Sequence, residues 1–461
     1  SPATPVNHSQ RRPRHPGRTM HTAQGPATRA DAGPGTAQRP LNVFLLGLNA
    51  FHRAKLAAVS HAREYRFHGL LEEPHADADY DIPGRLAAAE AELRAFDGPV
   101  DAVVGYMDFP VSTMLPLLCR HFGLRSPSLE SVIRCEHKYW SRLQQYAAIP
   151  GHAPRAAAID PFDDASIARI PFDAPYWLKP VKSSGSRLGF RITDARALRR
   201  AVARIRAGID VLAEPFNFVL GQLDLPPEVA AVDGYHCVAE EIIGGRQCTL
   251  EGCVHEGEML CHGIVDSIRA PNRVSFVRYE YPSRLPRRVQ AAMTGLARRV
   301  LEHVGFDNGG FNIEFFWDRG RDRIWLVEIN TRVAQHHGDL FEKVDGVTNL
   351  EAPIQVALGR RPRMPHREGR FRRAATFFLR RYGDARVTAV PAPETIRAVE
   401  RDVPGAVIHL QVEPGMRLSQ LFEQDSYSYA LALIYIGADS ERELLRRYRA
   451  VVERLHFGFA P

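Results

Sequence analysis

Short apolar runs alternate with helical patterns over the first third of the chain. Residues 41–48 form a continuous apolar run, and residues 49–62 after it have a helical pattern. A helix rich in Ala and Glu is predicted over 85–96, before a second apolar run at 100–104. Continuous apolar runs are typical of strands buried on both faces, so this alternation predicts a parallel α/β layer that ends near Pro127.

The rest of the chain mixes helical patterns with strand patterns. Helices are predicted over residues 131–148, 194–207, 286–304 and 441–455. Strands are predicted over residues 176–181, 238–243, 248–254, 311–317 and 324–330. A loop rich in Ser and Gly, residues 182–189, follows the first of these strands, and an Arg-rich linker at 360–373 precedes the mixed region that begins at 374.

Composition excludes several broad classes of protein. The chain has 461 residues, of which 45% are hydrophobic and 25% charged, as in ordinary globular proteins of two to four domains. Its net charge is +7, but residues 1–40 hold six Arg and one Asp, so the remaining body is nearly neutral. We therefore expect no nucleic-acid partner.

Hydrophobicity and cysteine usage bear on the surroundings of the protein. No apolar run approaches the ~20 residues that a membrane-spanning helix needs, so we expect no membrane partner. The six cysteines include no C-x-x-C pair and are too few for a disulfide framework in so long a chain. These features predict a reduced, cytoplasmic protein.

The strand patterns at 311–317 and 324–330 carry acidic and amide side chains. If the turn between them centres on Arg321, Glu314 faces Glu328 and Asn312 faces Asn330 on one surface of the hairpin. The other surface is then the core, and its predicted members are Phe311, Ile313, Phe315, Trp317, Trp325, Val327 and Ile329.

Directly opposed carboxylates repel each other and need a cation, a shared proton or basic neighbours. Mg²⁺ prefers oxygen ligands and commonly binds one or two carboxylates together with substrate phosphates. We therefore predict that Glu314, Glu328 and Asn330 bind Mg²⁺ or Mn²⁺. The alternative is a solvated sheet face that arginines neutralise, namely Arg319, Arg323 or Arg332. A β-bulge would change the register on which this prediction rests.

Lysine is rare in this chain. Only five of its 60 basic residues are lysines, at Lys55, Lys138, Lys179, Lys182 and Lys343. Where arginine is used almost everywhere, a lysine can mark a place that needs a compact ammonium instead of a planar guanidinium group.

An ordered set of these features resembles the ATP-grasp superfamily, chiefly its carboxylate–amine ligases. The set comprises Lys138, Lys179-Pro180, the Ser/Gly loop, Glu240-Glu241-Ile242-Ile243, Glu314 and Glu328-Ile329-Asn330-x-Arg332. Each motif alone is weak, whereas the whole set in this order is fairly specific. The resemblance covers residues 41–360, and the region after 374 is more loosely similar to the small closing domain of L-amino-acid ligases.

The resemblance implies an α/β protein with an ATP-grasp fold, α+β in its nucleotide-binding part. The expected domains are a disordered Arg/Pro-rich tail at 1–40, a Rossmann-like pre-domain at 41–130, the ATP-grasp domain at 131–360 and a small α+β domain at 374–461.

The resemblance also implies roles for residues that contact the nucleotide. Lys138 and Lys179 correspond to the two lysines that contact ATP, the second of them at the phosphates. The loop that closes over the phosphates corresponds to Ser183, Ser184, Gly185 and Ser186. The segment that binds adenine and links two subdomains corresponds to Glu240, Glu241 and Ile243, with either Glu accepting from the adenine amino group. The position of the acid that contacts ribose in many relatives falls near Gln247 or Glu251.

For the reaction itself, Glu314, Glu328 and Asn330 correspond to the metal ligands, in agreement with the hairpin argument. Arg332 corresponds to a residue that contacts the transferred phosphoryl group or the acyl intermediate, and Lys179 acts on the phosphates beside it. The structural alternative for Arg332 is charge balance for the two Glu.

A second metal hypothesis concerns the His and Cys residues between 236 and 262. These are His236, Cys237, Cys248, Cys253, His255, Cys261 and His262. Structural zinc sites usually show paired ligands at short spacing, which this segment lacks. In strand-like runs a cysteine more often serves as a small hydrophobic residue.

The resulting functional hypothesis is an ATP-dependent ligase that joins a carboxylate to an amine through an acyl phosphate and releases ADP and phosphate. Amino acids or dipeptide-like molecules are the expected substrates, and a homodimer is the expected assembly because dimers are common among such ligases. One alternative is a carboxylase that resembles biotin carboxylase. The other is an ATP-binding protein without turnover.

Overall fold

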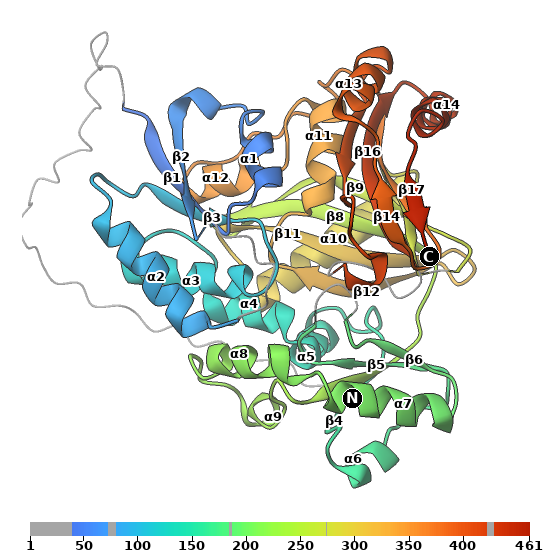
Figure 1. The fold of residues 1–461 in the computed structure, drawn as a ribbon. Helices are drawn as coiled ribbons and strands as arrows, with labels where there is room; N and C mark the ends of the chain where they lie inside the picture. Colours follow the sequence, from blue (N-terminus) through green and yellow to red (C-terminus); the bar gives the residue numbers. More distant parts are fainter. Residues whose placement is uncertain (1–38, 72–79, 184–186, 273, 422–427) are drawn as a thin grey trace, which may run out of the picture. The chain divides into compact units, whose positions relative to one another are not determined.

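A parallel three-stranded sheet begins the described part of the chain. The computed structural model (Figure 1) describes residues 39–71, 80–183, 187–272, 274–421 and 428–461. Strand β1 (Leu41–Leu46) lies between β2 (Tyr65–Leu70) and β3 (Ala102–Gly105) and pairs with both in parallel, as the alternation of apolar runs predicts. The sequence pattern misses β2, because polar residues interrupt its apolar positions.

Helices join the strands of this sheet and extend beyond it. They are α1 (Ala50–Leu56), the 3₁₀ turn η1 (Ala62–Glu64), α2 (Ile82–Ala95) and α3 (Val111–Phe122). Asn49 caps α1, because its side chain accepts a hydrogen bond from the His52 N–H at 2.8 Å.

The helical pattern at 131–148 forms two helices and not the single helix that was predicted. They are α4 (Leu129–Glu136) and α5 (Lys138–Ala148), and His137 between them has an extended backbone. The Nδ1 atom of His137 accepts from the Trp140 N–H at 3.1 Å, while Nε2 lies 2.8 Å from the Val232 carbonyl oxygen. The imidazole therefore caps α5 and makes Lys138 the first residue of that helix.

A four-stranded antiparallel sheet follows, in the order β4-β7-β5-β6. Its strands are β4 (Ala156–Ile159), β5 (Tyr176–Pro180), β6 (Phe190–Ile192) and β7 (Cys237–Glu241). The helices of this region are α6 (Asp164–Ala168), α7 (Ala195–Arg206), α8 (Asp210–Leu220) and α9 (Pro227–Ala230). Residues 242–245 then lead directly from β7 into the larger sheet.

The larger sheet has eight strands in the order β12-β11-β8-β9-β10-β13-β16-β15. Its strands from the middle of the chain are β8 (Arg246–His255), β9 (Glu258–Arg269), β10 (Phe276–Tyr281), β11 (Gly309–Asp318) and β12 (Arg323–Asn330). Those from the C-terminal region are β13 (Arg373–Arg381), β15 (Val407–Leu410) and β16 (Tyr429–Ala438). The C-terminal strands thus continue the sheet that the middle of the chain begins, and the three domain boundaries stay predictions.

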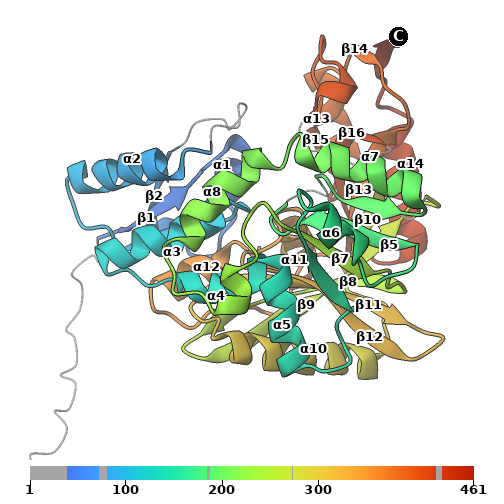
Figure 2. The ribbon, with the colours of Figure 1, turned by 90° about the horizontal axis from the view of Figure 1, so that it is seen from below.

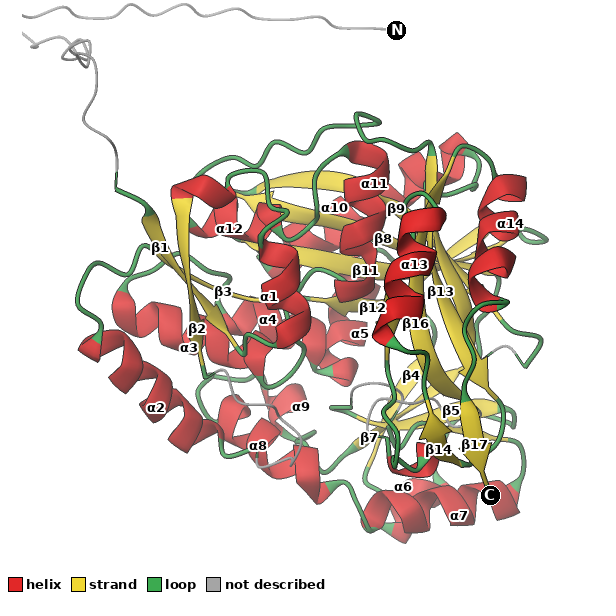
Figure 3. Ribbon diagram, turned by 45° about the horizontal axis from the view of Figure 1, so that its top comes forward, coloured by secondary structure: helices red, strands yellow, loops and turns green. Residues whose placement is uncertain are grey.

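Helices flank the larger sheet (Figure 3). They are α10 (Arg287–Val304), α11 (Gly338–Asp345), α12 (Glu351–Ala357), α13 (Pro393–Asp402) and α14 (Glu441–Val452). Two 3₁₀ turns, η2 (Gln335–His337) and η3 (Leu418–Gln420), and a two-stranded sheet of β14 (Arg386–Ala389) and β17 (Gly458–Ala460) complete the described fold.

The hairpin of β11 and β12 has the predicted pairing at one end and a β-bulge at the other. Glu314 pairs with Glu328, but Phe315 pairs with Leu326, so Val327 is the extra residue of β12. The bulge exchanges the faces of the residues nearer the turn. The core positions of β12 are therefore Ile324, Leu326 and Ile329, and the prediction that Trp325 and Val327 point into the core is wrong.

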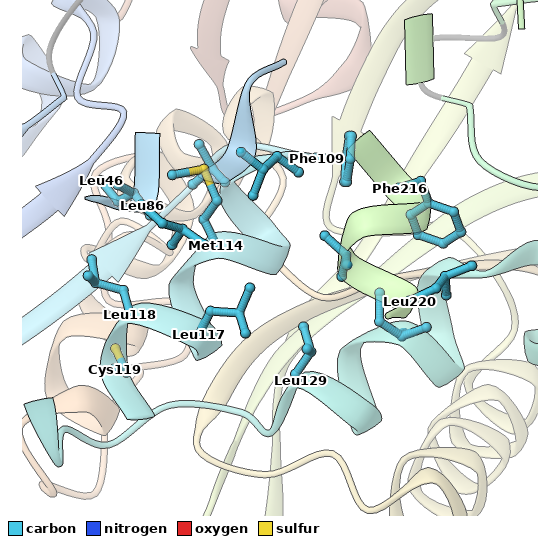
Figure 4. Close-up of a cluster of buried hydrophobic side chains, with 14 of the residues drawn as sticks. Leu46, Leu86, Phe109, Met114, Leu117, Leu118, Cys119, Leu129, Phe216 and Leu220 are labelled. Atoms are coloured by element: carbon cyan, nitrogen blue, oxygen red, sulfur yellow. The ribbon is translucent and has the colours of Figure 1, made fainter. Parts of the chain in front are cut away.

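Helix α8 ties the four-stranded sheet to the N-terminal helices (Figure 2). Its Phe216 and Leu220 share one buried cluster with Leu117 and Leu129 of the N-terminal segments (Figure 4). Val181, directly after β5, belongs to the same cluster. Apolar burial thereby fixes the start of the Ser/Gly loop against α3 and α4.

Two predictions fall outside this description. The disordered tail predicted at 1–40 lies almost entirely outside the described residues, as do Ser184, Gly185 and Ser186 of the predicted phosphate loop. Among the described residues, no helix is long and apolar enough to cross a membrane.

Candidate active site

Two glutamates face each other at the edge of the larger sheet. Glu314 of β11 and Glu328 of β12 are direct partners across the ladder, and so are Asn312 and Asn330. Asn330 donates through Nδ2 to Asn312 Oδ1 at 2.9 Å. Because its NH₂ group is used in this way, the amide oxygen of Asn330 is the atom that can bind a cation beside the two carboxylates.

The pKa values of the two carboxyl groups shift in opposite directions. Burial, and then the charge of Glu328, raises the pKa of Glu314. Partial burial alone would raise the pKa of Glu328 as well, but Lys138 and Lys179 lower it below its ordinary value. One carboxylate is thus compensated by lysines while its partner is not, and this arrangement fits a divalent cation between them.

Two of the rare lysines lie beside this pair. Lys138 Nζ is 3.4 Å from Glu328 Oε1 and donates to the Ser183 carbonyl oxygen at 2.9 Å. Lys179 Nζ on β5 is 2.7 Å from Glu240 Oε2. Burial lowers the pKa of Lys138, because an ammonium group loses hydration there. The structure therefore brings the two predicted phosphate lysines to the same place as the predicted metal ligands.

Glu240 has a second cationic partner that the sequence analysis did not identify. Arg142 Nε of α5 donates to Glu240 Oε1 at 2.9 Å, so Arg142 and Lys179 hold the two carboxylate oxygens. Burial alone would raise the pKa of Glu240, but these two cations lower it to about 2. One of the two carboxylates predicted to contact adenine is thus ionised and held by two cations.

The other predicted adenine-contacting residues lie at the connection between the two sheets. Glu241 accepts from the backbone N–H of Arg155 at 2.8 Å and lies 3.2 Å from its guanidinium Nε. Ile243 is half-buried in the connecting segment at 242–245. The segment that contains Glu241 and Ile243 therefore connects the sheet that carries Lys179 to the sheet that carries the two opposed glutamates.

Gln247 contacts the glutamate pair directly. Its Nε2 donates to Glu314 Oε2 at 2.9 Å, and its Oε1 accepts from Arg269 Nε at 2.6 Å. The alternative ribose residue, Glu251, is fully buried and accepts from Asn349 Nδ2 at 2.9 Å and the Ala334 N–H at 3.2 Å. Glu251 therefore supports the fold, and Gln247 orients a candidate metal ligand.

Arg332 joins the glutamate pair to the N-terminal sheet. Its Nη2 lies 3.1 Å from Asp108 Oδ2, in the loop that follows β3. Burial would raise the pKa of Asp108, but Arg332 and Lys182 hold it well below its ordinary range. The Nε atom of Arg332 is buried without a hydrogen-bond partner among the described residues, which leaves a donor for a bound oxygen.

The sequence analysis also missed a buried ion pair behind the site. Lys182 Nζ lies 2.5 Å from Glu136 Oε2, and both side chains are nearly inaccessible to solvent. The other oxygen, Glu136 Oε1, accepts from Thr331 Oγ1 at 2.7 Å. The carboxylate of Glu136 in α4 thereby contacts two other segments of the site. One contact is Lys182 at the start of the Ser/Gly loop, and the other is Thr331, the residue before Arg332. The scarcity of lysine marked Lys182, but nothing in the sequence marked its partner.

The zinc hypothesis finds no support in the positions of its residues. In the ranges that the structure describes, no three His, Cys, Asp or Glu side chains form a group that could hold a metal ion. His236 Nδ1 lies 2.8 Å from Asp233 Oδ1, and Cys237, Cys248 and Cys253 are buried in strands.

Comparison with known proteins agrees with this geometry. Residues 172–338 match the family model described as an ATP-grasp domain. No curated protein matches the chain by sequence. An L-amino acid ligase from Bacillus licheniformis has a similar structure, with a TM-score of 0.71 and 15% sequence identity over 92% of this chain and 100% of that one.

Two further solved structures are similar over most of their length. A biotin carboxylase from Campylobacter jejuni gives a TM-score of 0.60 at 15% identity, over 90% of this chain and 92% of that one. An N5-carboxyaminoimidazole ribonucleotide synthetase from Thermotoga maritima gives a TM-score of 0.60 at 13% identity, over 90% and 99%. At these identities the likeness establishes the fold alone.

Proposed function

Because this chain carries an ATP-grasp domain and has the ATP-grasp fold, we propose that it is an ATP-dependent carboxylate–amine ligase. It would form an acyl phosphate, release ADP, and then form an amide and release phosphate. The observation that carries the proposal is the opposition of Glu314 and Glu328 on neighbouring strands, with Lys138 and Lys179 next to them.

In this proposal ATP lies between the two sheets, with its adenine at the connection that contains Glu240, Glu241 and Ile243. Lys138, Lys179 and the loop at 183–186 contact the phosphates, since ammonium groups and the N–H groups of a Gly-rich turn bind anions. Gln247, which donates to Glu314 Oε2, is the residue we propose nearest to the ribose.

The residues present fit Mg²⁺ or Mn²⁺. Glu314 is a carboxylate whose pKa is raised by burial and by a second carboxylate, and the amide oxygen of Asn330 completes a set of oxygen ligands with Glu328. When bound, such an ion neutralises charge on the triphosphate and orients it.

The chemical steps place specific demands on the chain. An oxygen of the substrate carboxylate attacks the γ-phosphorus, the bond to the ADP oxygen breaks, and an acyl phosphate forms. The nitrogen of the amine then attacks the acyl carbon, the bond to the phosphate oxygen breaks, and the amine loses a proton. Lys179 and Arg332 stabilise the charge on the transferred group, because catalysis of phosphoryl transfer rests chiefly on positioning and electrostatics.

Amino acids or dipeptide-like molecules are the substrates we propose to test first. The TM-score of 0.71 to an L-amino acid ligase, against 0.60 to a biotin carboxylase, supports this order. A carboxylase that activates bicarbonate uses the same ATP chemistry and is the second candidate. A cytoplasmic location and a homodimer are part of the same proposal.

The deciding experiment is a screen for ADP formation with ATP and Mg²⁺. One arm supplies pairs of L-amino acids, and the other supplies bicarbonate with biotin. ADP and phosphate formed only with amino-acid pairs, together with a dipeptide detected by mass spectrometry, would support the ligase. Turnover only with bicarbonate and biotin would favour the carboxylase, and ATP binding without ADP formation in any mixture would indicate a protein without turnover.

A further inference from the structure

The five lysines of the chain lie in two clusters, and the proposed function uses only one of them. Lys138, Lys179 and Lys182 pair with Glu328, Glu240 and Glu136 of the candidate site, while Lys55 and Lys343 share one carboxylate elsewhere. Lys55 Nζ is 3.0 Å from Asp339 Oδ2, and Lys343 Nζ is 2.5 Å from Asp339 Oδ1. These three side chains are 15%, 10% and 4% exposed in the order Lys55, Lys343, Asp339. We name these three residues the Lys55 cluster, together with their neighbours Phe51, His52, His336, His409 and Tyr435.

The Lys55 cluster contains several polar atoms that the chain itself does not satisfy. Four buried polar atoms there have no hydrogen-bond partner among the described residues: His52 Nε2, His336 Nδ1, His409 Nε2 and Tyr435 Oη. Tyr435 and His52 are 0% and 1% exposed. Unsatisfied buried polar atoms cost free energy, so their concentration in one place points to a ligand that satisfies them.

Aromatic contacts hold these groups around Phe51. The ring of Phe51 lies 5.4 Å from that of His409 and 6.3 Å from that of His336, between ring centroids. Lys55 Nζ is 5.9 Å from the centroid of Phe51 and 5.0 Å from that of Tyr435. Its bond to Asp339 uses one of three N–H donors, so the ammonium group keeps donors for a further acceptor.

A short segment of the chain links the cluster to the reaction centre. Arg332 stands only four residues before His336, whose ring lies 6.3 Å from that of Phe51. Gln335 Nε2 contacts Met107 Sδ at 3.1 Å, directly beside Asp108, the partner of Arg332. In the binding mode inferred here, the substrate has its reacting group at Arg332 and its far end at Lys55.

We propose that the Lys55 cluster binds a substrate carboxylate that does not take part in the reaction. This inference rests on the proposed function and deepens it, because it assigns the substrate a second, anchoring acid group. The free carboxylate of an amino acid that supplies the amine is one source. A side-chain carboxylate of the acyl substrate is the other.

The charge in the cluster suits a single carboxylate. Lys55 and Lys343 place two ammonium groups on the single carboxylate of Asp339, which leaves one positive charge for a bound acid. Burial together with Asp339 raises the pKa of the neighbouring Glu342, so a second anion is disfavoured there. Neutral imidazoles and the Tyr435 hydroxyl add donors without adding charge. A dianionic phosphate ester would require more positive charge than this set provides, and arginine is the residue that best matches phosphate geometry.

The experiment compares acids with their primary amides on three variants. Lys55→Met removes the ammonium group, Lys55→Arg keeps the charge, and Arg94→Met is the control because it removes an exposed cation of α2 outside the cluster. In each Lys55 variant Asp339 retains Lys343, so the buried carboxylate is not left unpaired. Isothermal titration of each L-amino acid and its amide gives affinity without turnover, and ADP formation gives KM for the pair that the unmodified chain consumes.

We expect the unmodified protein to bind the acid on the order of tenfold more tightly than the amide. Lys55→Met should bring this ratio close to one, Lys55→Arg should keep part of it, and Arg94→Met should keep all of it. If Lys55→Met loses the preference for the α-carboxylate of the amine substrate, the anchoring group is that carboxylate. If it loses only the preference for aspartate or glutamate over asparagine or glutamine, the anchoring group is a side-chain carboxylate of the acyl substrate. An unchanged ratio in Lys55→Met, or an equal loss in Arg94→Met, would overturn the inference. The titration tests this inference separately from the proposed function. A chain that binds acids through Lys55 but forms no ADP would refute the ligase activity and leave the binding site intact.

Discussion

Arg142 donates through Nη2 to the carbonyl oxygen of Val327 at 2.7 Å, and Val327 is the extra residue of the β12 bulge. The same guanidinium group binds Glu240 at 2.9 Å. Helix α5, which precedes the four-stranded sheet, thereby fixes the bulge in the eight-stranded sheet. Because the bulge lies next to Glu328, Arg142 also stabilises the register that places Glu328 opposite Glu314.

Replacing Arg142 with Met should therefore lower the free energy of unfolding by roughly 3 kcal/mol, since it removes one partner of a buried ion pair. The measurement is urea denaturation, followed by tryptophan fluorescence. Arg94→Met is the control, because Arg94 is 66% exposed and forms its ion pair with Glu90 one turn away on the same helix. The control should change stability by less than about 1 kcal/mol. Equal losses in the two variants would contradict the role of Arg142.

The β11–β12 hairpin shows which structural features the local sequence predicts. Alternating apolar and polar residues around a turn predict both strands and the pairing of Glu314 with Glu328. The bulge was not predictable in this way, because it depends on Arg142, which lies 185 residues before Val327 in the chain. A contact at that separation leaves no periodic signal, and so the facing of Trp325 was predicted wrongly.

The residues of the candidate site were likewise predictable only in part from the sequence. Lysine scarcity singles out Lys138, Lys179 and Lys182, and motif order singles out the first two of them. Glu136, the partner of Lys182, and Asp108, the partner of Arg332, have no local pattern, since a buried carboxylate is identified only by the cations that the fold brings to it. Strand β2 was missed for a related reason, because its pairing with β1 compensates for a weak apolar pattern.

The metal assignment predicts the effect of Glu328→Gln. The amide keeps the shape of the side chain but removes the charge that would bind Mg²⁺, so ADP formation should fall by roughly a hundredfold or more. A coupled ADP assay measures the rate with the substrate pair found in the screen. Glu394→Gln, at an exposed position of α13, is the control and should keep the unmodified rate. Wild-type turnover in Glu328→Gln would refute the assignment of Glu328 to the metal.

The depressed pKa of Glu240 predicts acid sensitivity. Burial opposes ionisation, but Arg142 and Lys179 lower the pKa from an ordinary 4.5 to about 2. A carboxyl group whose pKa is lower in the folded state stabilises the fold above pH 4.5, and this contribution is lost as the pH falls toward 2. Between pH 6 and pH 3 the loss from this group is about 2 kcal/mol. Glu240→Gln should therefore show a correspondingly shallower decline in urea stability over that interval, and parallel declines in the two proteins would contradict the ion-pair account.

The last prediction concerns Glu136 and Lys182, which act on the site as one unit. Glu136→Gln leaves the ammonium group of Lys182 buried without its counter-charge and weakens the link to Thr331, so Lys138 and Arg332 lose their common support. We expect kcat/KM for ATP to fall on the order of a hundredfold, because small displacements of positioning groups are costly in phosphoryl transfer.

A double-mutant cycle separates this role from a general loss of stability. If the pair positions the site as a unit, Glu136→Gln combined with Lys182→Met should be no slower than either single variant, because the second change removes the unpaired charge that the first created. Urea denaturation of the same four proteins reports stability independently. Effects on kcat/KM that simply add would show that the two residues act separately, and a rate loss that merely follows the unfolded fraction would reduce the pair to a structural one.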